Sequence, residues 1–211
     1  MPGNKTLRNT LLAGLLLAAI SALPVAAQPQ SPFNANPAAL REGTYMLDPA
    51  HGKITWSVMH LGLSRYQGQI AGVKGELRLD PKAPEQSTLL VTIPMDGGGT
   101  FDADLDAHLR SADFFDVAKY PTATFTATRI ERVGERGARV TGDLTLRGIT
   151  KPVTFEAVFN SAGIHPVTKR YTAGFDGTAT IRRSEFGMTY LVPGVSDEVR
   201  LQLEGEFQLS E

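Results

Sequence analysis

The sequence VRLQLEGEFQL, residues 199–209, alternates apolar side chains with charged or amide side chains at every second position. In an extended chain, Val199, Leu201 and Leu203 lie on one face, whereas Arg200 and Gln202 lie on the other. This period of two predicts a β-strand with one face in a hydrophobic core and the other in water.

The same alternation recurs from Thr44 onward, with Gly, Pro, Asn or Asp between the segments. Residues 102–111 (DADLDAHLRS) are the exception, because good helix formers and an acidic first turn predict a short helix there. A second short turn is expected at residues 183–186. Long helices do not alternate with the strands, which favours an antiparallel sheet. The pattern predicts about eight or nine strands, centred on residues 44–47, 54–58, 73–79, 89–93, 123–127, 140–146, 153–159, 171–181 and 199–209.

The length of the strands favours a barrel over a sandwich. Several of them run for roughly 8–11 residues, whereas strands most often have about 5–6. About eight long strands, each with one apolar face, suit an all-β, antiparallel, up-and-down barrel with its apolar side inward. Some inward positions are small, among them Gly142, Ala157, Gly177 and Gly205. These positions indicate either an internal apolar cavity or only the taper and bends of the strands, and spacing alone leaves both interpretations open.

Composition excludes several classes of protein. The chain has 211 residues, 42% of them hydrophobic, and a formal net charge of −1. Intrinsic disorder is therefore not expected, and neither is a general nucleic-acid binder, which needs a basic face. The chain has no cysteine, which rules out disulfide frameworks, thiolate metal sites and cysteine nucleophiles.

The N-terminal residues have the pattern of a secretory signal peptide. Lys5 and Arg8 precede an apolar run from Leu11 to Leu23, and small residues follow up to Ala27. We expect a signal peptide at residues 1–27, a flexible leader at 28–43 and one barrel domain at 44–209, with an uncleaved membrane anchor as the alternative for the first segment. In a Gram-negative host the exported protein would be periplasmic.

Residues able to carry chemistry are few. His60 has the same parity as Trp56 and Val58 and is expected to point into the barrel, whereas His51 and His165 are expected in loops. The spacing of Asp102, Asp104 and Asp106 mimics the start of a calcium loop. However, Ala107 stands where that loop needs Gly, and Asp113 replaces its bidentate Glu. We therefore expect no metal site, no cofactor and no catalytic residues.

Four strings of sequence resemble the YceI family of exported polyisoprenoid-binding proteins with a lipocalin-like barrel. They lie in order at residues 45–62, 106–125, 142–153 and 182–199, and together they span nearly the whole expected domain. Two departures stand out, because Leu105 occupies a position where the family often has Arg, and Val195-Ser196-Asp197 replaces the usual Gly-Asp.

The resemblance implies an extended barrel that sequesters or transports a polyisoprenoid or an isoprenoid quinone. His60 or His108 would hydrogen-bond the head group at the mouth. The resemblance is also compatible with transient membrane contact and with a homodimer. The apolar residues expected to line the interior are Trp56, Val58, Val91, Phe125, Phe155, Phe175, Leu201 and Leu203.

Two other functions remain open from the sequence. One is a hydrolase or isomerase of small apolar substrates that uses His60 or His108 with Asp106. The other is an envelope stress protein that acts through a protein partner, which a solid barrel with an exposed apolar patch would favour.

Overall fold

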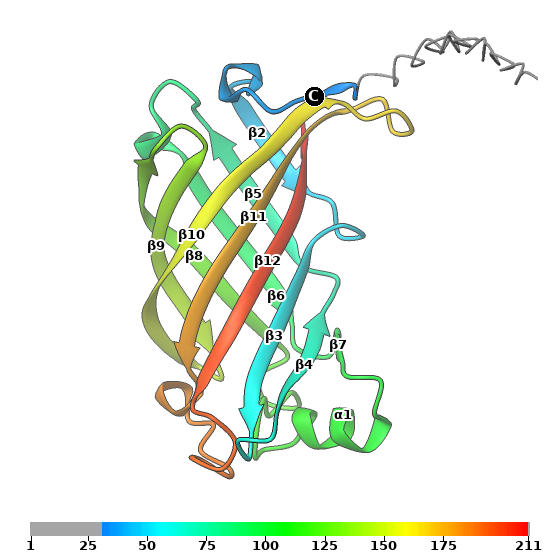
Figure 1. Ribbon diagram of the computed structural model, residues 1–211, viewed down its shortest axis with the longest axis vertical. Helices are drawn as coiled ribbons and strands as arrows, with labels where there is room; N and C mark the ends of the chain where they lie inside the picture. Colours follow the sequence, from blue (N-terminus) through cyan, green and yellow to red (C-terminus); the bar gives the residue numbers. More distant parts are fainter. Residues whose placement is uncertain (1–30, 211) are drawn as a thin grey trace, which may run out of the picture. The chain divides into compact units, whose positions relative to one another are not determined.

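The computed structural model describes residues 31–210, which form a closed antiparallel β-barrel of eight strands with one α-helix (Figure 1). The expected fold class is therefore confirmed. The predicted signal peptide, residues 1–27, lies outside the described residues.

Each barrel strand pairs with the next one along the chain, and β12 closes the barrel on β2 and β3. Three of the eight strands are interrupted by short excursions, so that each consists of two segments in line. The interrupted strands are β2 (Gly43–Leu47) with β3 (Lys53–His60), β4 (Ser64–Ile70) with β5 (Lys74–Leu79), and β6 (Thr88–Pro94) with β7 (Gly98–Gly99). The continuous strands are β8 (Thr122–Val133), β9 (Gly137–Leu146), β10 (Ile149–Ile164), β11 (Tyr171–Arg182) and β12 (Glu198–Leu209).

The helical excursion predicted at residues 102–111 is α1 (Ala103–Arg110). Asp102 caps it, because its carboxylate accepts hydrogen bonds from the backbone N–H groups of Asp104 and Leu105, both at 3.1 Å. Three short 3₁₀ turns accompany it, η1 (Pro37–Ala39), η2 (Pro84–Gln86) and η3 (Arg183–Phe186), and η3 is the turn expected at residues 183–186. The helix α1 and the turn η3 lie at one end of the barrel, whereas η1 and η2 lie at the other (Figure 1).

Small inward residues partly serve close packing of the strands. A Cβ atom on Gly142 would lie 2.4 Å from Cζ of Phe125, so only glycine lets that ring lie across β9. Gly205 is similarly crowded by Phe207 and Leu47, at 2.9 and 3.0 Å. Glycines on the inner face thus make room for neighbouring large side chains.

Residues 33–41, which lie within the leader predicted at residues 28–43, contact the barrel. The strand β10 continues to Ile164 after its pairing with β9 stops at Val158, and the exposed edge pairs with β1 (Phe33–Asn34). The Tyr171 hydroxyl donates to the Ala39 carbonyl, and the Arg41 guanidinium lies 4.0 Å from the centre of the Tyr171 ring. An unpaired strand edge therefore provides backbone partners for a segment that has no hydrophobic periodicity of its own.

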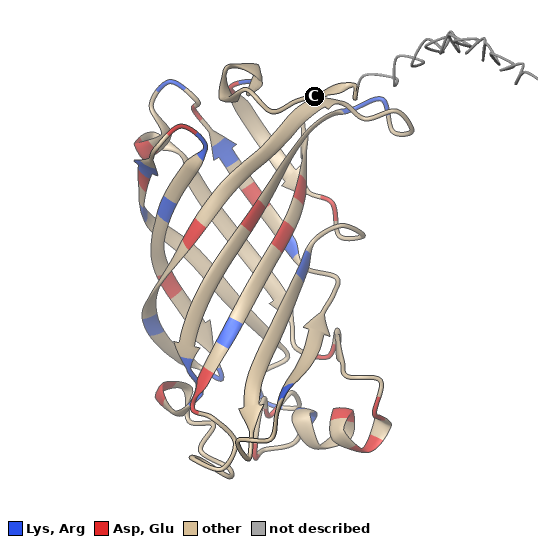
Figure 2. Ribbon diagram, viewed as in Figure 1, with Lys and Arg blue, Asp and Glu red and all other residues tan. Residues whose placement is uncertain are grey.

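Charged residues of both signs are interspersed along the strands of the barrel rather than gathered in one basic face (Figure 2). Among the described residues, no helix has the length and apolar character needed to cross a membrane.

Candidate ligand-binding cavity

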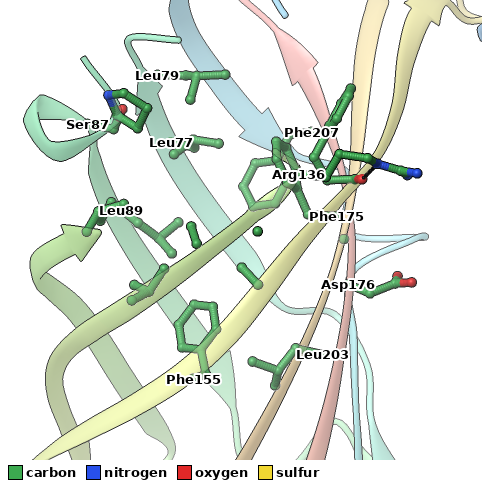
Figure 3. Close-up of a pocket in the computed structure, with 18 of the residues that line it drawn as sticks. Leu77, Leu79, Ser87, Leu89, Arg136, Phe155, Phe175, Asp176, Leu203 and Phe207 are labelled. Atoms are coloured by element: carbon green, nitrogen blue, oxygen red, sulfur yellow. Dashed lines mark hydrogen bonds between the residues drawn. The ribbon is translucent and has the colours of Figure 1, made fainter. Parts of the chain in front are cut away.

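The barrel encloses an apolar cavity of about 1000 Å³. Figure 3 shows Leu77, Phe155 and Leu203, which come from three different strands, directed into the same space, whereas Asp176 points away from it. This volume lies at the upper end of the range for small-molecule sites, roughly 300–1,000 Å³. The walls can therefore take apolar surface out of water but offer few polar groups to it.

Six of the residues proposed from the sequence line this cavity. They lie on five strands, at the positions where the alternating pattern turns a large apolar side chain inward. Phe125 and Phe155 meet edge to face with their ring centres 5.5 Å apart, which defines part of the wall. The six are Val91, Phe125, Phe155, Phe175, Leu201 and Leu203.

Trp56 and Val58 do not border the cavity, although they share the inward parity of Ile54, which does. Val58 is buried, and the Trp56 ring packs against β4 so closely that a Cβ atom on Gly68 would lie 2.3 Å from it. Trp56 packs against the hydrophobic core beyond the end of the cavity, and Val58 lies two residues further along β3. Parity identifies the inner face but not whether that stretch of the interior is hollow.

His60 and His108 lie away from the cavity, which differs from the expected head-group role at its mouth. His60 is exposed at the end of β3, beside Val195, rather than directed into the barrel. His108 lies on α1, where its Nε2 is 2.9 Å from a carboxylate oxygen of Asp113 and its ring packs against Phe114 and Tyr190. Both histidines are at the end of the barrel opposite to the open one.

Asp106 has a structural role in this protein. One of its carboxylate oxygens accepts hydrogen bonds from both the backbone N–H and the hydroxyl of Thr100, at 2.8 and 2.7 Å. His108 pairs with Asp113 instead, so the dyad required by the hydrolase hypothesis is not assembled. Within residues 31–210, no group of three His, Asp or Glu side chains is placed to hold a metal ion.

The cavity opens at the end formed by three loop segments that the alternating pattern did not single out. These are residues 35–40, residues 81–87 around η2, and residues 132–137 at the β8–β9 hairpin. They bring Lys82, Arg132 and Arg136 to the rim together with Glu135. Arg136 is held in place, because its guanidinium donates to the carbonyls of Phe159 and Asn160 at 2.9 and 2.7 Å. No sequence periodicity marks loop residues, so only the folded chain reveals them.

Two buried tyrosines anchor the rim segment through their hydroxyls. Tyr45 is fully buried and donates to the Arg41 carbonyl at 2.8 Å, while Tyr171 donates to the carbonyl of Ala39. Burial raises the pKa of Tyr45 to about 12 and also raises the pKa of Tyr171. Both phenols therefore stay protonated as donors throughout the physiological pH range.

The opposite end of the barrel is closed around Arg183. This side chain is 3% exposed, and its guanidinium donates to four backbone carbonyls within residues 188–196, at distances of 2.8–2.9 Å. Asp197 completes the closure by accepting hydrogen bonds from the backbone N–H and the hydroxyl of Ser184, both at 2.8 Å. The loop that follows η3 is thereby fixed under the barrel, with Phe186 and Met188 buried.

Comparison with known proteins gives a consistent family assignment. The family model of the YceI-like domain matches residues 45–207. A UPF0312 protein of Pseudomonas putida (strain W619) is 41% identical over 138 residues, which are 65% of this chain and 71% of the relative. A UPF0312 protein of Ectopseudomonas mendocina (strain ymp) is 39% identical over 156 residues, 74% of this chain and 81% of the relative.

Solved structures resemble the barrel over most of its length. Burkholderia cenocepacia BcnA superposes with a TM-score of 0.68 at 26% identity and covers 76% of this chain and 98% of its own. The Campylobacter jejuni YCEI protein gives 0.65 at 28% identity, covering 72% and 90%. A polyisoprenoid binding domain from Saccharophagus degradans, implicated in plant cell wall breakdown, gives 0.59 at 13% identity, covering 79% and 98%, and shares the fold.

Proposed function

This chain belongs to the YceI family, and from that premise we propose that its barrel binds one long-chain isoprenoid lipid or isoprenoid quinone and carries it through an aqueous compartment. The observation that carries the proposal is the cavity of about 1000 Å³, which is walled by apolar side chains and open at one end. A flexible apolar chain is the ligand that such a space accommodates without any specific polar contact.

The energetics support a carrier that needs no catalytic group. Each methylene moved from water into an apolar site contributes about 0.8 kcal/mol, and an isoprene unit has five carbons. Lost freedom of the chain and of the complex offsets much of this gain, by an estimated 4–15 kcal/mol. Several buried units nevertheless leave enough for micromolar affinity or better, which is about −8 kcal/mol.

Binding rather than catalysis is also the function that the positions of the histidines favour. The described residues include all four histidines, and none of them lines the cavity. The fold shared with the Saccharophagus polyisoprenoid binding domain supports the same choice of ligand class.

We propose that the carrier acts in the periplasm of a Gram-negative host, because the N-terminal pattern is that of a signal peptide and a lipid crossing an aqueous space needs a shielded environment. Loading and unloading would then take place during transient contact with a membrane. A homodimer is compatible with the proposal but is not required by it, since one barrel contains the whole cavity.

Action through a protein partner is the second candidate, and exposed leucines at the closed end favour it. Leu61, Leu63 and Leu191 are 55–81% exposed in the β3–β4 turn and in the loop after η3. These two loops are hydrogen-bonded to each other through Leu61 N–H and the Gly194 carbonyl. Surface patches of this kind often mark contacts. If this candidate is correct, replacing Leu63 and Leu191 by Ser should abolish the protein's contribution to survival of envelope stress. The same variant should leave the lipid occupancy of the barrel unchanged.

Native mass spectrometry tests the carrier directly. Protein exported by its own host and purified without detergent should carry a stoichiometric adduct, and an organic-solvent extract of the same sample should contain an isoprenoid of that mass. A protein that is ligand-free and also fails to bind an added polyprenyl quinone would contradict the proposal.

A pair of matched substitutions, one inside the cavity and one outside the barrel, tests where the ligand binds. Leu203→Glu places a carboxylate on the apolar wall and should lower affinity by at least tenfold, about 1.4 kcal/mol, because the charge must stay hydrated. Gln202→Glu adds the same charge at the adjacent, outward and exposed position and should bind normally. Equal effects of the two substitutions would place the ligand outside the barrel.

A further inference from the structure

The cavity occupies only part of the barrel interior. On β6, β8 and β9 the last residues that border it are Ile93, Phe125 and Leu144. The next inward residue in each case, two positions closer to the α1 end, does not border it. These next residues are Met95, Ala123 and Leu146, which are 4%, 2% and 7% exposed and belong to the continuous hydrophobic core.

This boundary is a floor supported from below. Phe186 and Met188 are 1% and 4% exposed and pack into the same core, as do Phe115 and Val117 from the segment after α1. Arg183 fixes the loop that carries Met188 through its bonds to backbone carbonyls. A protein interior packed in this way has no room for a further ligand segment unless side chains are displaced.

The floor and the mouth lie at opposite ends, so a chain that enters meets a closed end. The rim consists of residues 35–40, 81–87 and 132–137, and α1 and η3 lie beyond the floor (Figure 1). The depth of the cavity therefore limits the length of chain that can be taken out of water.

We propose that this blind cavity selects its ligand by chain length, so that about six isoprene units are fully buried and further units remain outside at the mouth. The number follows from dividing the cavity volume of about 1000 Å³ by roughly 30 Å³ for each carbon, which is the volume that one water molecule occupies in the liquid. The inference rests on the proposed function and adds a limit to it, namely that only about six isoprene units of the chain are buried.

Competitive loading from vesicles measures this limit. Phosphatidylcholine vesicles would contain an equimolar series of polyprenyl quinones that differ by single units, from three to ten, and native mass spectrometry would report the occupancy of each. A unit that enters the cavity exchanges one apolar environment for another, so occupancy should change little up to about six units. Each further unit leaves the bilayer without entering the cavity, so occupancy should then fall by at least about tenfold per unit.

Two variants move the limit in opposite directions. Ala179 borders the cavity, and Ala179→Phe should lower the length limit by about one unit, because the ring fills the volume of one isoprene. Leu146→Ala removes part of the floor and should raise the occupancy of the seven-unit chain several-fold relative to the six-unit chain. Thr180→Phe, at the adjacent exposed position on β11, is the matched control and should leave the distribution unchanged.

The outcomes separate the two proposals. If no chain of any length loads, the carrier function itself is wrong. If chains load but occupancy does not fall with length, or if Ala179→Phe and Thr180→Phe give the same distribution, the carrier function stands and length selection is wrong. A Leu146→Ala variant that fails to fold still leaves the comparison between positions 179 and 180.

Discussion

Single polar side chains hold the loops at both ends of the barrel, and Arg183 is the clearest case. It is buried, yet it pairs with backbone carbonyls rather than with a carboxylate. The planar guanidinium fits this use, because its five donors point in fixed directions around its edge. One side chain thus satisfies several carbonyls that a buried loop would otherwise leave without partners.

Arg183→Lys should lower the free energy of unfolding by about 2–4 kcal/mol, because an ammonium group cannot reach all four carbonyls and buried unpaired acceptors cost about 1–3 kcal/mol each. Urea unfolding followed by circular dichroism measures the change. Arg182→Lys makes the same substitution at the exposed neighbouring position and should alter stability by less than about 0.5 kcal/mol. Similar losses for both variants would contradict the role assigned to Arg183.

On the outer wall, Asp48 and His51 form a pair that predicts a pH dependence. Nδ1 of His51 lies 2.9 Å from an Asp48 carboxylate oxygen, and Glu206 lies 3.9 Å from the same nitrogen. The hydrogen bond to Asp48, followed by the charge of Glu206, raises the pKa of His51, and the bond to His51 lowers the pKa of Asp48. The charged pair therefore stabilises the fold between the ordinary pKa values of the two groups, 3.8 and 6.5.

This contribution is lost when the pH rises through the folded-state pKa of His51 and also when the pH falls through that of Asp48. An NMR titration of the His51 ring should give a pKa above 6.5, and Asp48→Asn should return it toward that value. Glu206→Gln should lower it by less, because Glu206 acts only at longer range. A His51 pKa that Asp48→Asn leaves unchanged would contradict the pairing.

Among the elements, the segment made of β1 and η1 lies closest to function, because residues 35–38 and Leu40 form part of the rim. Its regular backbone structure is limited to two residue pairs with β10 and the 3₁₀ turn at Pro37–Ala39. Its order depends on anchors from the barrel, of which the Tyr171 hydroxyl is one. Such weakly held segments are the first to open in native proteins.

Tyr171→Phe should loosen this segment while leaving the barrel intact, because it deletes one hydrogen bond worth about 1 kcal/mol. Hydrogen exchange at the amides of Ala39 and Leu40 should become about fivefold faster, since 1.4 kcal/mol corresponds to a factor of ten. Amides in β11 and β12 should keep their protection. Tyr190→Phe, at an exposed tyrosine of the closed end, should change none of these rates.

At the scale of the whole molecule, the barrel has a hollow part next to the mouth and a filled part next to α1 and η3. The hollow part contains the cavity walls, and the filled part contains Met95, Ala123, Phe186 and Met188, which are 1–4% exposed and do not border the cavity. Substitutions in the filled part should therefore lower the free energy of unfolding more than substitutions in the hollow part, because they remove more packing contacts.

Two Phe→Ala substitutions should reveal this division. Phe186 is 1% exposed, and Phe186→Ala should cost about 3–5 kcal/mol of unfolding free energy, since it opens a new void in the packed core. Phe155 already borders the cavity, so Phe155→Ala should cost at least about 1 kcal/mol less, mainly the lost contact with Phe125. Urea unfolding of the ligand-free proteins measures the two losses of unfolding free energy. Equal losses would mean that the cavity is collapsed in solution.

The structural features that can be predicted from the sequence are those set by residues close together along the chain. The barrel and α1 follow from it, because the alternation at residues 199–209 and the acidic first turn at residues 102–111 are set by near neighbours along the chain. Inward parity likewise identified Phe125, Phe155 and Leu203 as cavity residues. The same parity suggested Trp56 and His60, because it specifies a face of the strand and carries no information on its depth in the barrel.

The sequence by itself therefore determined an antiparallel barrel with an apolar interior, since the period of side chains along a strand follows from backbone geometry alone. Only the tertiary structure decided where that interior is empty. The floor consists of Met95 after β6 and of side chains from β8 and β9, together with the loop fixed by Arg183, and the rim includes a segment that pairs with the free edge of β10. These groups meet only when distant parts of the chain pack together, so no local pattern encodes the depth of the cavity or the position of its mouth.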